Sequence, residues 1–481
     1  MKKDGSLGFK EKVSYGLGAV GKDMVYMLSA SYVLYYFQDI LGVNAAAMGV
    51  ILLAARIFDA FNDPIMGLLV AKTKTKMGKF RPWLLIGTLT NAVILYLMFA
   101  APPSLNAGGM VAYAACTYIL WGVTYTMMDI PYWSMIPAFT KGGKEREGLT
   151  TLARSCAGVG SAIVQILTMI AVKSIGRALN PEGALDKQIE LTGFKYFTLI
   201  VAVLFIVFIV ITVINIKEES TVEMQSASVK DMFKALLKND QAIAIVIAIV
   251  LINCSIYLTS NLVIYFFKYD FGGGEWQNAY TLFTTFGGGT QILAIMLLYP
   301  FLRYTLKLSN TKIFYVALGG AILGYVALLC LAFTNMANVY LLFIPGFFIF
   351  AANGVLSTLT TVFLANTCDY GLLKNGRSDE SVIFSMQTFV VKLASGVAVF
   401  VAGIALQIFK LKKDDADIIS GFDYSSAVSE SSKIGLRMTM TIIPVIGLFV
   451  AILWFKKKYI LTDAKIEEIS NELKAKSLSE N

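Results

Sequence analysis

The chain has 481 residues, of which 57% are hydrophobic and only 15% are charged. Soluble proteins carry about a quarter charged residues, so this composition excludes an ordinary water-soluble protein of several domains and favours a membrane protein. The net charge is +9, and histidine is absent. The absence of histidine excludes every catalytic triad, metal site and proton relay that needs an imidazole.

Twelve segments are apolar and long enough to cross a membrane as helices, for which about 20 residues suffice. They lie at about 14–38, 45–70, 82–101, 110–139, 148–172, 194–216, 239–267, 277–302, 312–333, 338–366, 381–409 and 434–455. We therefore predict an all-α polytopic membrane protein of twelve transmembrane helices. The six-plus-six spacing suggests two related halves, although no residue-level repeat between them is evident.

The spacing of these segments also predicts the domain organisation. We expect an N-terminal six-helix bundle at 1–216, a middle loop at 217–238, a C-terminal six-helix bundle at 239–455 and a tail at 456–481. Within the tail, apolar residues that share one helical face predict a short amphipathic helix over Thr462–Asn481.

Lysine and arginine mark the cytoplasmic side of membrane proteins. If the N-terminus is cytoplasmic, 27 of the 41 basic residues lie in cytoplasmic segments, 9 lie outside and 5 lie within the spans. We therefore expect a multi-pass protein of the cell membrane with both termini in the cytoplasm. The positive charge then faces anionic lipids, and no nucleic-acid partner is needed to explain it.

The second span carries ionisable residues in the string ARIFDAFNDP. Spacings of three, four and seven place Arg56, Asp59, Asn62 and Asp63 on one helical face. Two carboxylates with an amide oxygen suit a small hard cation such as Na⁺. Without a cation the two acids could share a proton, so the same pair could carry H⁺. The alternative is an arginine–aspartate pair that only holds helices together.

The fourth span carries Tyr125, Asp129 and Trp133 at intervals of four residues. This spacing predicts that all three lie on one helical face. An aromatic ring beside a carboxylate is typical of sugar binding, because the ring covers the apolar face of the sugar and the carboxylate accepts hydroxyl protons. Helix packing is the alternative role for each aromatic residue alone.

Further charges lie within other predicted spans. Span 1 carries the adjacent pair Lys22 and Asp23, span 5 carries Arg154, and span 11 carries Lys392 one turn after Thr388. The intramembrane set has four acids, Asp23, Asp59, Asp63 and Asp129, and four bases, Lys22, Arg56, Arg154 and Lys392. Such a balanced set can be buried together where isolated charges could not.

These motifs together resemble those of the glycoside–pentoside–hexuronide:cation symporters, a branch of the major facilitator superfamily, and most closely the melibiose carriers. The matching strings run from span 1 to span 11 and are YGLGAVGKD, ARIFDAFNDPIMG, MGKFRPW, GTLTN, YILWGVTYTMMDIPYWSMIP, KEREGL, DYG and MQTFVVK. One departure is Asn366 in ANTCDYG, where melibiose carriers have an acid.

The resemblance implies two bundles of six helices around a central cavity, and it implies roles for individual residues. The coupling cation would be bound by Asp59, Asn62, Asp63 and Thr126, with Asp59 and Asp63 as the Na⁺-binding acids. The sugar would be bound by Lys22, Asp23, Tyr125, Asp129, Trp133 and Arg154, with Thr388 and Lys392 at the cavity between the bundles.

We therefore expect a symporter that couples uptake of a small, melibiose-like glycoside to Na⁺, or to H⁺ or Li⁺, by alternating access. It is expected to act as a monomer, without a cofactor beyond the coupling ion and without enzymatic activity. Two alternatives are a carrier of lipids, lysolipids or other organic solutes on the same fold, and a non-transporting membrane sensor. The sequence does not name the sugar or fix the ion.

Overall fold

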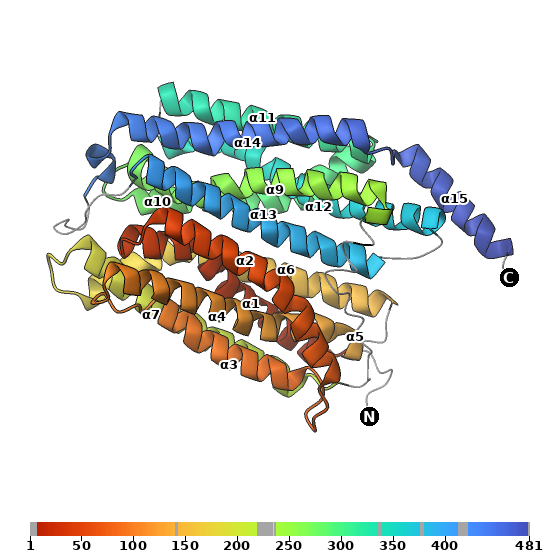
Figure 1. Cartoon of the computed structure of the whole chain (residues 1–481), viewed down its shortest axis with the longest axis horizontal. Helices are drawn as coiled ribbons and strands as arrows, with labels where there is room; N and C mark the ends of the chain where they lie inside the picture. The colour runs from red at the N-terminus through yellow and green to blue at the C-terminus, as the bar shows by residue number, and fades with distance from the viewer. Residues whose placement is uncertain are drawn as a thin grey trace. The chain divides into compact units, whose positions relative to one another are not determined.

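The computed structural model describes residues 7–139, 143–218, 234, 237–334, 336, 338–375, 380–411 and 422–479. Figure 1 traces these residues from the N-terminus to the C-terminus as a succession of helices. The described chain forms two compact units. Unit 1 comprises Met1–Ser226, Gly273–Thr281 and Lys412–Asp423, and unit 2 comprises Ala227–Gly272, Leu282–Leu411 and Tyr424–Asn481. Most of the predicted middle loop, 217–238, lies outside the described residues.

Unit 1 contains the first six long helices. They are α1 (Phe9–Tyr35), α2 (Ala45–Lys72), α3 (Arg81–Met98), α4 (Ala107–Ser134), α6 (Gly143–Leu179) and α7 (Asp186–Asn215), with a short α5 (Ile136–Phe139) between α4 and α6. Within this unit α1 packs against α6 and α7, α3 against α4 and α7, and α2 against α4. Gly160 of α6 allows one of these contacts, because a Cβ atom there would lie 2.2 Å from the carbonyl oxygen of Val20 in α1.

The next six long helices belong to unit 2, apart from the first residues of α10. They are α9 (Asp240–Phe266), α10 (Trp276–Leu293), α11 (Asn310–Thr334), α12 (Phe343–Asn375), α13 (Glu380–Ile408) and α14 (Glu430–Lys458). The π-helical turns η3 (Ala294–Leu298) and η4 (Phe301–Thr305) extend α10.

The twelve long helices confirm the predicted all-α fold. Eleven described helices are long and apolar enough to cross a membrane by composition alone. Helix α1 is not among them, because it carries Lys22 and Asp23 near its middle. Several helices also extend beyond the predicted apolar segments: α6 covers 143–179 instead of 148–172, and α7 begins at Asp186 instead of 194. Hydropathy detects only the apolar part of a helix, whereas backbone hydrogen bonds continue into polar residues.

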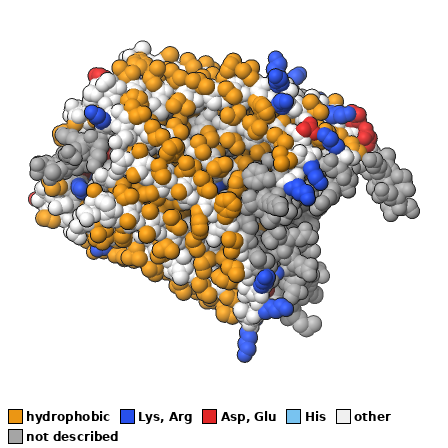
Figure 2. Space-filling view, viewed as in Figure 1, with side chains coloured by type: hydrophobic (Ala, Val, Ile, Leu, Met, Phe, Trp, Pro, Cys, Tyr) orange, Lys and Arg blue, Asp and Glu red, His pale blue; other side chains and the backbone are white. Residues whose placement is uncertain are grey.

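Helix α7 illustrates why these helices suit a bilayer. Its inner face buries a stripe that includes Val201, Phe205 and Ile209, whereas Ile200 and Val203 on the opposite face are about half exposed. A soluble helix would carry polar residues on its outer face. Apolar side chains likewise cover much of the surface seen in Figure 2. The outer face of the molecule is therefore suited to hydrocarbon.

The two units repeat one arrangement of helices, although no residue-level repeat is evident in the sequence. In unit 2, α9 packs against α13 and α14, α11 against α12 and α14, and η3 against α12, which is the order of partners seen in unit 1. The first helix of each half also ends in a π-helical turn, η1 (Tyr36–Ile40) after α1 and η2 (Phe267–Phe271) after α9. Each turn buries an aspartate at its fourth position, Asp39 and Asp270.

The C-terminal tail forms the predicted helix, α15 (Asp463–Ser479). It packs against α12, and Ile469 is only 2% exposed. At its first residue, the carboxylate of Asp463 accepts a hydrogen bond from Arg303 of η4 at 2.6 Å. The tail is therefore fastened to unit 2 by an apolar contact and an ion pair.

The start of α3 depends on a carboxylate from the end of α7. The Glu218 carboxylate accepts hydrogen bonds from three successive backbone amides, those of Lys79 at 2.6 Å and of Phe80 and Arg81 at 3.0 Å. The first amides of a helix have no partner within the helix, and a negative charge there also interacts favourably with the helix dipole. The side chain of Arg81 in turn donates to the carbonyl of Val213 in α7. Glu218 thus caps α3 and joins it to α7.

We predict that Glu218→Ala lowers the thermal unfolding midpoint of the purified protein in detergent by about 2 to 4 °C. The three amides would lose a charged acceptor, and a change of about 1 kcal/mol shifts the midpoint of a large domain by that amount. Glu182→Ala removes an exposed carboxylate elsewhere in unit 1 and serves as the matched control. Equal midpoints for the two variants would contradict the capping role.

Candidate functional site

A buried ammonium group lies at the centre of the predicted site in unit 1. Lys22 of α1 is only 3% exposed, and its Nζ lies 2.8 Å from Oδ1 of Asp129 in α4 and 2.9 Å from Oδ2 of Asp23. It also donates to the hydroxyl of Tyr125 at 3.3 Å. A buried charge needs such partners, because its desolvation is otherwise costly.

The two carboxylates around Lys22 are more accessible than the amine. The side-chain exposures are 4% for Lys22, 19% for Asp23 and 30% for Asp129. A molecule that enters this region therefore meets carboxylate oxygens, and the amine lies behind them. Carboxylates held in place in this way can accept hydrogen bonds from hydroxyl groups.

Trp133 and Arg154 extend this cluster along α4 and α6. The indole Nε1 of Trp133 donates to Oδ1 of Asp129 at 3.2 Å. The guanidinium carbon of Arg154 lies 4.2 Å from the centre of the Trp133 ring, and Nζ of Lys22 lies 5.0 Å from it. Both distances are within the range of cation–π interactions. The structure thus brings together the six residues of spans 1, 4 and 5 that the resemblance assigned to the sugar site.

A group of stacked aromatic rings connects this cluster to α2. The ring of Tyr125 lies 5.3 Å from that of Trp121 and 5.6 Å from that of Tyr26, between ring centres. The guanidinium carbon of Arg56 lies 5.8 Å from the Tyr26 ring. The sequence analysis missed Tyr26 and Trp121, although Tyr26 follows Lys22 by four residues and therefore shares its helical face.

Helix α2 presents its charged face to α4. Arg56 and Asp59 are each 6% exposed, and Nη1 of Arg56 lies 3.7 Å from Oδ2 of Asp59. Gly122 of α4 is required beside Asp59, because a Cβ atom at this glycine would lie 2.6 Å from Oδ1 of the aspartate. Asp59 is thus enclosed by α4 backbone on one side and by a guanidinium on the other.

Asp63 contacts α4 one helical turn further along. Its Oδ1 accepts a hydrogen bond from the hydroxyl of Thr126 at 3.1 Å. The neighbouring Asn62 has a buried amide nitrogen without a hydrogen-bond partner among the described residues. Rotation of this amide by half a turn would place its oxygen where the nitrogen now lies. The structure therefore brings α2 and α4 into contact at Asp59 and Asp63, the two helices to which the resemblance assigned one cation site.

The donor atoms along this contact are of one chemical kind. Asp59, Asp63, Thr126 and Asn62 can offer carboxylate, hydroxyl and amide oxygens, which hard cations prefer. Among the described residues, no three histidine, cysteine, aspartate or glutamate side chains form a metal-binding group. The set therefore suits a small monovalent cation or a proton better than a transition metal.

Two tyrosines hold α1 against α4 beside this site, which the sequence analysis also missed. The hydroxyl of Tyr15 donates to the carbonyl of Tyr132, and the hydroxyl of Tyr132 donates to the carbonyl of Tyr15. Their rings stack with centres 4.4 Å apart. This reciprocal pair fixes the spacing between the helices that carry Lys22 and Asp129.

The predicted residues of span 11 belong to the other unit. Lys392 lies on α13 and is half-buried, whereas the side chain of Thr388 lies outside the described residues. Their contribution to a cavity between the two bundles stays a prediction.

Several known transport proteins are similar to this chain over nearly all of its length. It is 26% identical to the isoprimeverose transporter of Lactiplantibacillus pentosus, covering 93% of this chain and 88% of that protein. It is 26% identical to the raffinose carrier protein of Pediococcus pentosaceus, in a match that covers 96% of this chain and 71% of that protein. It is 25% identical to an inner membrane symporter of Escherichia coli, in a match that covers 97% of this chain and 95% of that protein.

Solved structures of transporters share the fold. A bacterial homologue of the human lysosomal transporter Spinster, in an inward-facing and unoccupied conformation, superposes with a TM-score of 0.63. The match covers 93% of this chain and 95% of that chain at 13% identity. The nucleoside transporter NupG superposes with a TM-score of 0.61 at 11% identity. This match covers 93% of this chain and 99% of that chain. At such identities the likeness concerns the fold alone.

A family model described as MFS/sugar transport protein matches residues 14–463. This range includes every residue of the site described above and all twelve long helices except the first five residues of α1. The family consists of multi-pass membrane transporters and not of enzymes. The chain thus belongs to the MFS/sugar transport proteins, as a member of the glycoside–pentoside–hexuronide:cation symporters of the major facilitator superfamily.

Proposed function

We propose that this protein is a secondary active symporter that couples the uptake of a small glycoside, such as a melibiose-like galactoside, to a cation. The two bundles would alternate between access from outside and access from the cytoplasm. The sugar transport named for the isoprimeverose and raffinose relatives supports this substrate class. Both termini would lie in the cytoplasm, as the distribution of basic residues predicts.

One observation carries this proposal: α4 contributes to both parts of the site. Gly122 and Thr126 contact the acids of α2, whereas Tyr125 and Asp129 contact Lys22 of α1. The two sets alternate within two turns of one helix. A cation that draws Asp59 and Asp63 together would therefore shift the residues that bind the sugar.

The sugar would bind at the exposed side of the Lys22 cluster. The carboxylates of Asp23 and Asp129 would accept hydroxyl protons, and the indole of Trp133 would cover an apolar face of the ring. Arg154 would donate to sugar oxygens, because a guanidinium carries several donors and no acceptor. Linkage then requires that the sugar raises the cation affinity by the same factor by which the cation raises the sugar affinity.

The cation would displace Arg56 as the partner of Asp59. The Nη1–Oδ2 distance of 3.7 Å is longer than that of a hydrogen bond, so this contact is mainly electrostatic and a cation can take the place of the guanidinium. We favour Na⁺ over H⁺, because the hydroxyl of Thr126 and the amide of Asn62 would add to the acids the neutral oxygen ligands that Na⁺ prefers. A proton would need only the two carboxylates.

A lipid or lysolipid carrier is the second candidate on this fold. The charged and hydroxyl-rich cluster around Lys22 disfavours it, because an acyl chain offers no partner for two carboxylates and a guanidinium. A carrier of this kind would need an apolar path into the site.

Uptake of radiolabelled glycosides tests the proposal directly. We expect cells that express the protein to accumulate at least one galactoside or pentoside against its gradient, and Na⁺ to stimulate this uptake at fixed pH. Stimulation by a pH gradient alone would assign the coupling to H⁺. Absence of uptake for the whole panel, with transport of a lysolipid instead, would contradict a sugar substrate.

For the cation site, we predict that Gly122→Ala weakens Na⁺ binding about tenfold or more. The added methyl group would overlap the Asp59 carboxylate, and such overpacking costs about 1 to 3 kcal/mol. The measurement is the Na⁺ concentration that half-maximally raises the thermal midpoint of the purified protein.

Gly158→Ala provides the matched control, because a methyl group there meets no atom within 4 Å. In Asp59→Asn we expect that Na⁺ no longer raises the thermal midpoint at all, whereas sugar binding is retained. Wild-type Na⁺ affinity in Gly122→Ala would show that the cation binds elsewhere.

For the sugar site, we predict that Asp129→Asn lowers sugar affinity by about tenfold to a hundredfold. A hydrogen bond to a charged group contributes about 1.5 to 3 kcal/mol, and the substitution also releases Lys22 from one of its two carboxylates. Binding of labelled sugar to membranes at saturating Na⁺ measures the effect. The Na⁺-dependent rise of the thermal midpoint should persist in this variant, and an unchanged sugar affinity would remove Asp129 from the site.

A further inference from the structure

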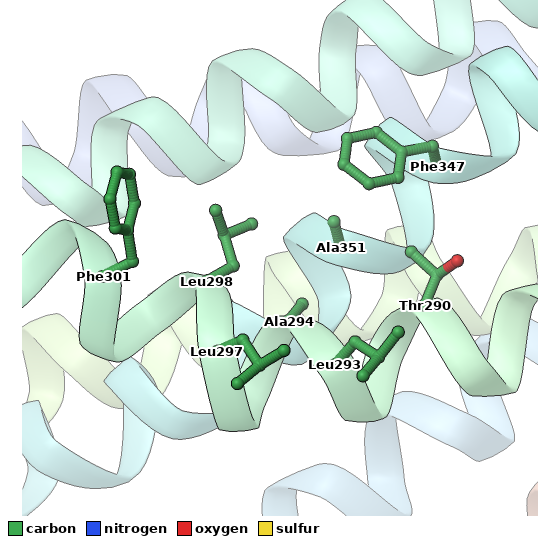
Figure 3. A pocket seen from close by; sticks show the side chains of 8 residues that line it. All are labelled: Thr290, Leu293, Ala294, Leu297, Leu298, Phe301, Phe347 and Ala351. Atoms are coloured by element: carbon green, nitrogen blue, oxygen red, sulfur yellow. The ribbon is translucent and has the colours of Figure 1, made fainter.

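An apolar groove runs along the outer side of unit 2, apart from the charged site. Its volume is about 390 Å³, and it lies between α12 and the chain that continues from α10 through η3 and η4. Figure 3 shows the lining side chains of Thr290, Leu293, Ala294, Leu297, Leu298, Phe301, Phe347 and Ala351.

The irregular backbone of α10 shapes this groove. Four of its eight lining residues fall in π-helical turns, namely Ala294, Leu297 and Leu298 in η3 and Phe301 in η4. A π-helical turn contains an extra residue and therefore shifts the side chains that follow it. Such turns are uncommon and are often found at functional sites, so the groove is more than a loose contact between two regular helices.

The groove is open to the surroundings of the protein. Leu293 and Leu297 are 56% and 63% exposed, and Phe301 and Phe347 are about half exposed. These residues belong to helices that are long and apolar enough to cross a membrane, so we expect lipid chains around their exposed side chains. A water-filled groove lined in this way would be unfavourable, because its apolar surface would remain hydrated.

The length of the groove matches one leaflet of a bilayer. Phe301 lies eleven positions after Thr290, which corresponds to at most about 16 Å at the α-helical rise of about 1.5 Å per residue. Half of a hydrocarbon core of about 30 Å is about 15 Å. One acyl chain of a phospholipid would therefore fill the groove from the headgroup region to the middle of the membrane.

Basic residues lie beyond the Phe301 end of the groove. Lys307 and Lys312 are exposed, and neither forms an ion pair within the described part of the chain. Lys312 is in the first turn of α11, whose first residue, Asn310, accepts a hydrogen bond from Tyr299 between η3 and η4 at 3.1 Å. The exposed ring of Tyr304 lies in the same segment, as is typical of the membrane interface. Arg303 is already paired with Asp463.

We propose that this groove binds an anionic phospholipid of the cytoplasmic leaflet. One acyl chain lies along Leu293, Leu297 and Phe301 against Phe347, and the phosphate lies near Lys307 and Lys312. The location in the cytoplasmic leaflet rests on the proposed topology, in which the segment 303–312 faces the cytoplasm and its anionic lipids. The lipid is a resident ligand of unit 2, whereas the sugar site lies in unit 1.

Photocrosslinking in vesicles tests this site with the full-length protein. Phosphatidylglycerol and phosphatidylcholine with a diazirine in one acyl chain are incorporated in parallel, and labelled tryptic fragments are quantified by mass spectrometry. The groove lies largely in fragment 269–303, whereas fragment 438–456 of α14 carries exposed apolar side chains that do not line this groove. We expect phosphatidylglycerol to label fragment 269–303 about fivefold more than phosphatidylcholine, since one basic residue near the headgroup contributes about 1 kcal/mol. Fragment 438–456 should show no such preference.

Two variants separate the acyl chain from the headgroup. Ala351→Phe fills the groove and should lower the labelling of fragment 269–303 by phosphatidylglycerol to the level given by phosphatidylcholine, without altering that of fragment 438–456. The double variant Lys307→Gln/Lys312→Gln leaves the groove intact and should remove the preference of fragment 269–303 for the anionic lipid. This second test does not depend on whether Ala351→Phe folds correctly. Equal labelling by the two lipids in the wild type would overturn the headgroup assignment. If a second copy of the chain covers the groove and shields fragment 269–303 from labelling by both lipids, the proposal that a lipid occupies the groove is wrong. Neither outcome depends on the transport activity.

Discussion

The burial of one lysine determines how the N-terminal unit is built. Lys22 lies in the middle of α1 and is almost fully buried, so its charge must be balanced within the unit. Asp23 supplies one carboxylate from the same helix, but Asp129 must come from α4. Helix α4 is therefore held at a fixed distance from α1, and the reciprocal hydrogen bonds of Tyr15 and Tyr132 maintain that distance.

The same helix also meets the charged face of α2, which explains how two ligands can be coupled. Gly122 and Thr126 face the aspartates of α2, and Asp129 lies one turn beyond Thr126. The aromatic rings of Tyr26 and Tyr125 fill the space between Arg56 and Lys22. In the proposed mechanism, a cation at α2 changes the position of α4 and hence of the carboxylate that binds the sugar.

Much of the site could be predicted because an ionisable residue within a membrane span is costly and therefore conspicuous. Six of the predicted residues, from Lys22 to Arg154, are brought together in one cluster by the structure. Tyr26 and Trp121 could not be distinguished from ordinary packing residues, since aromatic side chains are frequent throughout this chain. Gly122 could not be recognised either, because the need for a glycine arises only from the closeness of Asp59 on another helix. The repeated π-helical turns at Asp39 and Asp270 also escaped detection, because hydropathy does not distinguish a π-helical turn from an α-helical one.

The sequence by itself determined the all-helical membrane fold, the number of helices and the identity of the charged residues. These properties follow from the local requirement that a backbone in lipid satisfies its own hydrogen bonds and that few charges enter the hydrocarbon. Only the tertiary structure decided which charges become partners: Lys22 with Asp129 and Arg56 with Asp59. It also decided where α10 departs from regular geometry to form a groove. These pairings depend on distances between helices far apart in the sequence, and no local pattern encodes such distances.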